Sequence, residues 1–138
     1  MKNRISDKIK EIEKYLGELS SIRPKSLNYY IKDIKTRAAC ERYFEKISEA
    51  VIDLAILAIK DKGLEIPEND YEAFDILEKN ELIDKILSSR LKDMKGMRNI
   101  IAHQYGNVDD RIMFKAVDKE IETDVRNFIR IIKSIQKS

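Results

Sequence analysis

The feature that most constrains the fold is a helical spacing of apolar residues with few residues to interrupt it. The chain of 138 residues contains only four glycines, two prolines and no tryptophan. Glycine and proline are the residues that most disfavour a helix interior, so their scarcity favours long helices. No segment alternates apolar and polar residues with the period of two that a half-buried strand requires. We therefore predict an all-α protein.

Capping residues set the expected limits of the helices. Ser26 is suited to cap the start of the longest helix, and Gly63 is suited to end it. Asn69 or Asp70 can begin a short helix, which Asn80 interrupts. Together they predict an up-and-down bundle of four main helices plus a short helix, in a single domain over residues 1–138. The expected helices cover about residues 3–22, 26–62, 69–80 and 83 to a stop at Gly106 and Asn107, with a fifth after Asp109 and Asp110.

The apolar positions also identify the expected core. Residues 50–59 are apolar on most sides of their helix, so this segment should be the most buried. The core positions expected along the chain are Ile5, Ile9, Ile12, Leu16 and Leu19; Leu27, Tyr30, Ile31, Ile34, Ala38, Phe44, Ile47, Val51, Leu54 and Ala58; Phe74, Ile76 and Leu77; Ile83, Ile86, Leu87, Leu91, Met94, Met97 and Ile101; and Val117, Ile121, Val125, Phe128, Ile132 and Ile135.

The charge balance limits the kind of partner. Charged residues make up 38% of the chain, yet 27 Lys and Arg against 25 Asp and Glu leave a net charge of only +2. A uniformly basic surface that binds polyanions in bulk is therefore excluded, whereas a local basic patch remains possible.

Metal sites, disulfides and membrane segments are not expected. Cys40 and His103 are the only residues of their kinds, so the chain can form neither an internal disulfide nor a zinc site built from soft ligands. We expect no metal ion and no cofactor. The first residues are charged and periodic, unlike a signal sequence, and the longest apolar run is too short to span a membrane. A cytoplasmic protein is expected.

The stretch from Met97 to Asn107 carries the candidate chemistry. His103 can exchange a proton near neutral pH, and the planar guanidinium of Arg98, five residues earlier, matches a phosphate. Tyr105, two residues later, can donate a hydrogen bond, stack on a base or accept a modification. Such groups suit RNA cleavage, in which the ribose 2′-hydroxyl attacks its own phosphate and a cation stabilises the added charge. That reaction requires no metal.

Helical geometry limits this candidate site. Arg98 and His103 lie about 140° apart around an ideal helix, whereas Asn99 and His103, four residues apart, are neighbours. Efficient cleavage needs both a base and an acid, and the chain supplies one histidine. This is a physical reason to expect a homodimer whose cleft combines two copies of the stretch. The alternative is that a lone histidine near a helix end caps it or interacts with its dipole.

A run of cations precedes the motif. Lys92 and Lys95 lie among the basic residues between Lys85 and Arg98, where Asp93 is the single acid. They could contact an RNA backbone as a phosphate track. The alternative interpretation is a solvated helix face.

At these residues the chain resembles the HepT-like toxins of the HEPN superfamily. Arg98, His103 and Tyr105 are similar to the family's Arg-x4-His-x-Tyr motif, and the order of helices also agrees across nearly the whole chain. The motif departs from many relatives at Met97, where they carry an aromatic residue.

The resemblance implies a dimeric helical bundle of HEPN type with a metal-independent ribonuclease site between protomers. Arg98 and His103 would be the catalytic pair and Asn99 an auxiliary polar residue. It further implies a minimal nucleotidyltransferase antitoxin as partner, which transfers AMP onto Tyr105. The added charge and bulk would exclude RNA from the cleft. The alternatives are a non-catalytic module that binds a nucleotide or the partner, and a structural helical adaptor.

Overall fold

The computed structural model describes residues 1–103 and 108–137, and the described residues form helices and no strand. The predicted all-α class is confirmed. The predicted helix ends at Gly106 and Asn107 lie outside the described residues. The elements are α1 (Lys2–Ile22), α2 (Leu27–Lys32), α3 (Ile34–Asp61), α4 (Asp70–Lys79), α5 (Lys85–His103), α6 (Asp110–Lys115), the π-helical turn η1 (Ala116–Glu120) and α7 (Ile121–Lys137).

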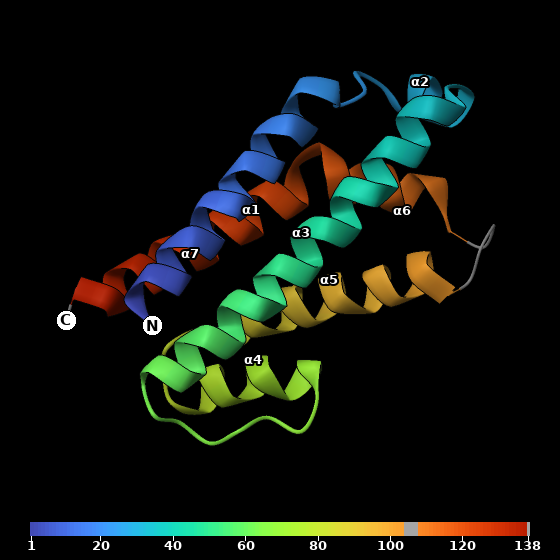
Figure 1. The fold of residues 1–138 in the computed structure, drawn as a ribbon. Helices are drawn as coiled ribbons and strands as arrows, with labels where there is room; N and C mark the ends of the chain where they lie inside the picture. The colour runs from blue at the N-terminus through green and yellow to red at the C-terminus, as the bar shows by residue number, and fades with distance from the viewer. Residues whose placement is uncertain (104–107, 138) are drawn as a thin grey trace.

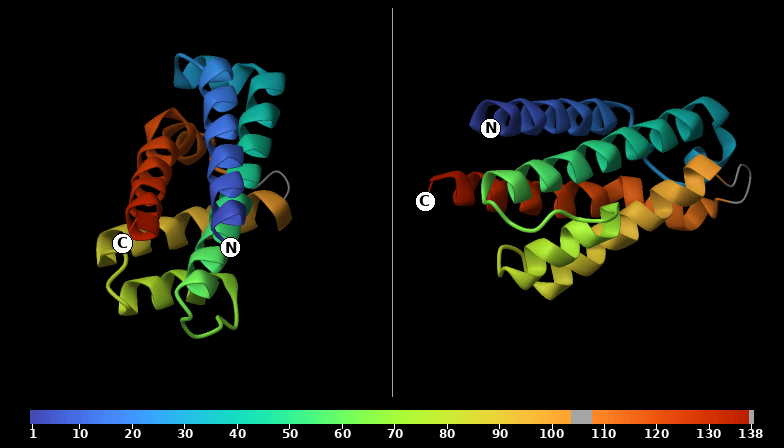
Figure 2. Two further views of the ribbon diagram at one scale, coloured as in Figure 1. Left: turned by 60° about the vertical axis from the view of Figure 1, so that its left-hand side comes forward. Right: turned by 60° about the horizontal axis from the view of Figure 1, so that its bottom comes forward.

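The helices pack around a shared apolar core. α1 and α3 run side by side in opposite directions, α7 packs behind them, and α5 crosses below with α4 against it (Figure 1). Both chain ends lie at the same end of the bundle, and the last turns of α5 approach the opposite end, near α6 (Figure 2). The described part of the stretch, residues 97–103, therefore lies toward one end of the bundle.

The predicted core is largely confirmed. All of the predicted positions on α1 are buried, as are those in the predicted 50–59 segment of α3 except the half-buried Ile56 and the exposed Asp53. The prediction that Ile86 belongs to the core is wrong, because this residue is 72% exposed. It lies about 100° around the helix from the buried Leu87 and so points away from the core.

The predicted second helix is wrong in one respect, because it is broken at Asp33. This residue has extended backbone angles (φ −96°, ψ 98°) between α2 and α3, and its Oδ2 accepts a hydrogen bond of 2.6 Å from the Thr36 hydroxyl. The break turns Tyr30 inward against the Phe114 ring, 6.0 Å away between centroids. Three predicted core residues beside the break are exposed instead: Ile31, Ile34 and Ala38.

The capping predictions are confirmed where the structure describes them. Gly63 has a positive φ of 65°, its N–H donates to the Lys60 carbonyl, and the N–H of Leu64 donates to the Ile59 carbonyl. This is a Schellman cap. The Asn69 side chain caps α4 by accepting from Glu72 N–H at 2.9 Å.

The last helix contains a feature that the spacing did not predict. Between α6 and α7 the backbone widens to η1, where the N–H of Ile121 donates to the carbonyl of Ala116. The Val117 carbonyl in this turn accepts a hydrogen bond of 3.0 Å from Arg23 Nε, at the end of α1. A π turn of this kind frees backbone groups for side-chain partners, and here it ties α6 and α7 to α1.

Candidate functional site

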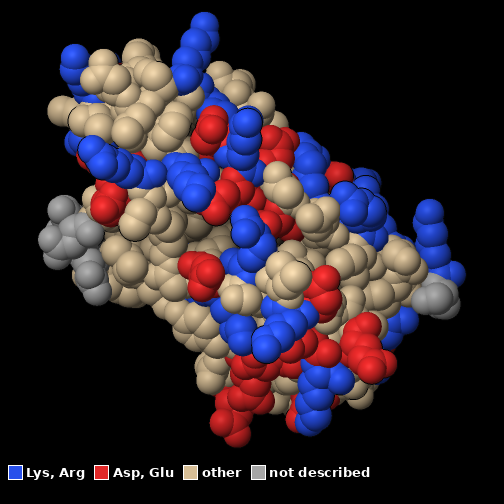
Figure 3. Space-filling model, turned by 180° about the vertical axis from the view of Figure 1, so that it is seen from behind, with Lys and Arg blue, Asp and Glu red and all other residues tan. Residues whose placement is uncertain are grey.

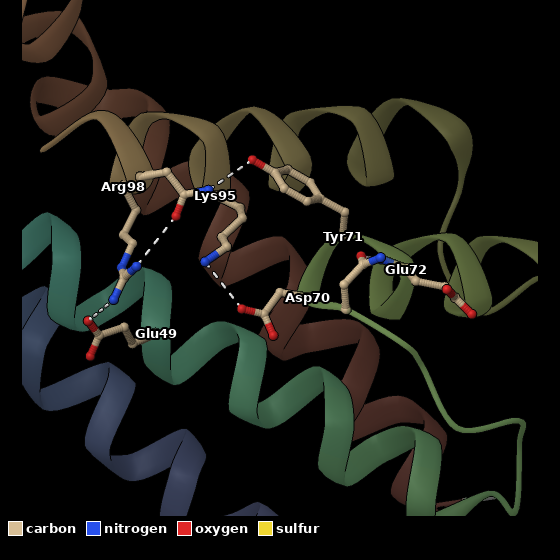
Figure 4. A network of polar contacts seen from close by, with 8 residues as sticks. Glu49, Asp70, Tyr71, Glu72, Lys95 and Arg98 are labelled. Atoms are coloured by element: carbon tan, nitrogen blue, oxygen red, sulfur yellow. Dashed lines mark hydrogen bonds and ion pairs between the residues drawn. The ribbon is translucent and has the colours of Figure 1, made fainter. Parts of the chain in front are cut away.

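The described part of the site stretch, residues 97–103, lies in the second half of α5, a helix with one apolar and one polar face. Leu91, Met94 and Ile101 are buried in the core. On the polar face, Lys95, Arg98 and Asn99 are directed toward α3 and toward the start of α4 (Figure 4). The amphipathic pattern thus orients the candidate residues toward neighbouring helices.

Arg98 is held by an acidic residue from α3. Its Nη2 donates to Oε1 of Glu49 at 2.7 Å, and the two side chains are 22% and 45% exposed. Its Nη1 lies 3.4 Å from the Asn99 Oδ1, a much weaker hydrogen bond. Among the described residues, the buried Nε has no hydrogen-bond partner. The guanidinium therefore has one strong anchor.

Asn99 is held from the opposite side by α4. Its Nδ2 donates to the hydroxyl oxygen of Tyr71 at 3.1 Å. Tyr71 lies in the first turn of α4, whose position the Asn69 cap fixes. Asn99 thus contacts Arg98 through its carbonyl oxygen and Tyr71 through its amide nitrogen.

His103 is the last residue of α5 that the structure describes, and its side chain is exposed. Within the described ranges it makes neither a hydrogen bond nor an ion pair with Arg98. The structure therefore brings together Arg98 and Asn99 but does not join them to His103 within one chain. Tyr105 lies outside the described residues.

The cations predicted as a phosphate track have carboxylate partners. The Lys95 Nζ lies 3.2 Å from Asp70 Oδ2, and the Lys92 Nζ lies 2.7 Å from Asp75 Oδ1. The hydrogen bond to Asp75 raises the pKa of Lys92, so its positive charge persists. These pairs attach α5 to α4, and RNA contact by either lysine stays a prediction. On the face opposite Figure 1, basic and acidic side chains are intermixed (Figure 3).

The sequence did not predict the residues that hold Arg98 and Asn99 in place. Glu49 was overlooked because it lies on α3, 49 positions from Arg98. It did leave a signal, since it is an acid immediately before the nearly continuous apolar run that begins at Ala50. Tyr71 left no such signal in the sequence, because a tyrosine near the start of a helix does not by itself indicate a polar partner.

Other features of the described residues add no further chemistry. Cys40 is a free, fully buried cysteine, and burial raises the pKa of its thiol to about 11. No group of three His, Cys, Asp or Glu side chains that could hold a metal ion occurs in the described part of the chain. None of the described helices is long and apolar enough to cross a membrane.

Comparisons with known proteins agree with this geometry. A model of the family described as "Ribonuclease HepT-like" matches residues 5–132. The chain is 30% identical over 126 residues to the "mRNA nuclease HepT" of Shewanella oneidensis, covering 91% of this chain and 88% of that protein. It is 27% identical over 115 residues to the "tRNA nuclease HepT" of Aphanizomenon flos-aquae, covering 82% and 77% respectively.

The fold has a similar counterpart among solved structures. The structure of the tri-AMPylated Shewanella oneidensis HEPN toxin in complex with MNT antitoxin matches with a TM-score of 0.89 and 28% identity. The match covers 97% of this chain and 99% of that one. The similarity in fold therefore extends over nearly the whole chain.

Proposed function

The chain belongs to the HepT-like ribonuclease family, and on this premise we propose that it is an endoribonuclease toxin of a toxin–antitoxin pair. The observation that carries the proposal is the placement of Arg98 and His103 on the last turns of α5. One is a permanent cation held by Glu49, and the other is an exposed proton-transfer group. The two relatives named as nucleases of mRNA and tRNA support RNA as the substrate class.

The proposed reaction is attack by a ribose 2′-hydroxyl on the adjacent phosphorus. A base removes the hydroxyl proton, the new 2′-oxygen–phosphorus bond forms, and the bond to the 5′-oxygen breaks. An acid protonates that leaving oxygen, giving a 2′,3′-cyclic phosphate and a 5′-hydroxyl. His103 performs a proton transfer, and Arg98 binds the phosphate and stabilises its added negative charge. Asn99 assists as a polar neighbour, and the reaction requires no metal ion.

A homodimer completes the proposed site. One chain supplies a single histidine, yet the reaction has two proton transfers. Because His103 is exposed at the end of α5, a second copy can approach it across a two-fold axis. The cleft then contains two copies of Arg98 and of His103. Lys92 and Lys95 would contact the RNA backbone by exchanging their carboxylate partners for phosphates, and Lys95, whose side chain is 10% exposed, would first have to leave its buried position.

The proposed regulator is a nucleotidyltransferase antitoxin that transfers AMP to Tyr105. The support is the similar HEPN toxin of Shewanella oneidensis, which is described as tri-AMPylated and in complex with MNT antitoxin. Each AMP adds a negative phosphate and an adenine two residues from His103. Repulsion and bulk would then keep RNA out of the cleft.

The direct test is RNA cleavage by the purified, unmodified protein with a chelator present. We expect cleavage that produces cyclic phosphate ends, and its loss in His103→Ala at unchanged thermal stability. An unmodified wild type that cleaves no RNA would refute the proposal in favour of a binding module. Cleavage abolished by the chelator and restored by a divalent ion would refute metal independence alone.

A further inference from the structure

The contacts of the Arg98 guanidinium are unequal in strength. The bond to Glu49 is charge-assisted and 2.7 Å long, whereas the bond to Asn99 is 3.4 Å long. Short charge-assisted bonds are about twice as strong as neutral ones, and a contact near 3.5 Å contributes little. The Glu49 carboxylate is therefore the anchor. Nη1 is the donor that a new acceptor can most readily take.

The side chain of Asn99, the weak acceptor for Arg98, is held in place by a second hydrogen bond. Asn99 donates through Nδ2 to the Tyr71 hydroxyl at 3.1 Å, which turns its carbonyl oxygen toward Arg98. A chain of contacts thus runs from Glu49 through Arg98 and Asn99 to Tyr71 and links α3, α5 and α4 (Figure 4). The guanidinium is therefore held directly by α3 and only indirectly, through the weak contact with Asn99, by α4.

We propose that Glu49 is a positioning residue for Arg98 in RNA cleavage, with the Tyr71 hydroxyl supporting the same arrangement through Asn99. This inference rests on the ribonuclease function proposed above. By holding Nη2, Glu49 fixes the plane of the guanidinium while Nη1 takes a phosphate oxygen. An unanchored arginine would lose several torsional freedoms at each catalytic event, and a misplaced cation stabilises the transition state poorly.

The same geometry predicts that Glu49 contributes little to folding. Its side chain is 45% exposed, and its carboxylate makes a single contact with the guanidinium. Ion pairs of this kind contribute little to stability because water already solvates the charges. Loss of Glu49 should therefore appear in catalysis and not in thermal unfolding.

The test is Glu49→Gln, which keeps the side-chain shape and removes its charge. We expect kcat to fall by roughly tenfold to a hundredfold, with KM and the melting temperature nearly unchanged. Glu49→Asp, which restores the charge on a shorter side chain, should recover part of kcat. The matched control is Asp53→Asn on the same helix, whose carboxylate lies 3.6 Å from Lys8 and away from the site. Its kcat should equal that of the wild type.

Two further measurements test the two parts of this proposal, the support from Tyr71 and the anchoring of the Arg98 guanidinium by Glu49. Tyr71→Phe removes only the hydroxyl and should reduce kcat by a few-fold. NMR of the Arg98 side chain, in the inactive His103→Ala protein, should show faster guanidinium rotation when Glu49→Gln is added.

A wild type that cleaves RNA together with a Glu49→Gln protein of equal kcat would overturn this inference and leave the proposed function intact. Loss of kcat that only follows a lowered melting temperature would also overturn it, since Glu49 would then be structural. A wild type without cleavage would overturn both proposals, even if the NMR difference were present.

Discussion

The middle of α3 and the last turns of α5 are held in place by different forces. Between Ala50 and Ile59, α3 is fixed by apolar burial on several sides. The polar face of α5 is fixed by single contacts between charged or polar atoms, such as the 2.7 Å pair of Arg98 with Glu49. Burial is non-directional and sums over many atoms, whereas a polar contact depends on one geometry. The first region should therefore determine stability and the second activity.

The largest effect should come from Arg98→Ala. We expect RNA cleavage to fall by about a thousandfold, because removal of one group that stabilises the developing charge has that size of effect. Stability should change little, since the lost ion pair is partly solvated. Single-turnover cleavage and chemical denaturation measure the two quantities.

Arg42→Ala is the control for this change, because it removes an exposed arginine from α3. Arg42→Ala should cleave RNA at the wild-type rate. If Arg98→Ala instead unfolded the protein, the last turns of α5 would be part of the stabilising core, and the contrast between the two regions would be lost.

The complementary change is Leu54→Ala in the middle of α3. Leu54 is fully buried, so the substitution leaves a cavity and should cost about 3 kcal/mol of unfolding free energy. Cleavage per folded molecule should remain that of the wild type. Urea denaturation measures the loss of unfolding free energy. The control is Ile66→Ala, at a residue that is 85% exposed, which should change the unfolding free energy very little. If Leu54→Ala kept the wild-type stability but cleaved RNA more slowly, the middle of α3 would determine activity and not stability.

The two regions also differ in how well the sequence predicts them. Apolar periodicity located most of the helices and most of their buried positions, because burial leaves a repeating pattern along one segment. It failed at Asp33, where the backbone is extended, the Thr36 hydroxyl donates to the Asp33 carboxylate, and the helix that the pattern would continue is interrupted. It also gave no sign of the π turn at Ala116–Glu120, which keeps the same stripe buried.

The candidate site was predictable only in part. The motif named Arg98 and His103 because both lie within one short stretch. Glu49 and Tyr71 could not be paired with Arg98 and Asn99, since they are 49 and 28 positions away and the pairing depends on how three helices pack. One sequence carries local patterns, but long-range polar pairs appear only once the fold is built.

The start of α4 contacts the end of α5 through Tyr71 and Asn99, and Asn69→Ala tests what this contact contributes. The substitution removes the side-chain cap on Glu72 N–H and should cost about 1 kcal/mol of unfolding free energy. Because Tyr71 lies in the same first turn, we also expect a modest loss of kcat. Thermal unfolding and cleavage assays should show both losses, and Asn69→Asp, which retains a capping oxygen, should show neither. A stability loss without any change in kcat would separate α4 from the site.

The smallest effect should be a pH dependence at the α2–α3 break, far from the burial that stabilises α3. The hydrogen bond from Thr36 holds the pKa of Asp33 below its ordinary value in the folded protein. A depressed carboxyl pKa contributes stability above the unfolded-state pKa of about 3.9, and this contribution is lost as pH falls through the folded value. Asp33→Asn should therefore lose less stability than the wild type between neutral pH and strongly acidic pH.

Thr36→Val tests the cause of this pH dependence, because it removes the donor and leaves the carboxylate. Melting temperatures at neutral and acidic pH should show reduced acid sensitivity for both variants, and a smaller reduction for Thr36→Val because Tyr29 also lowers the pKa of Asp33. Wild-type acid sensitivity in both variants would mean that the break is held by backbone geometry alone. The hydrogen bond between Thr36 and Asp33 would then contribute nothing to stability. Single polar contacts would matter only at the end of α5, where they affect activity.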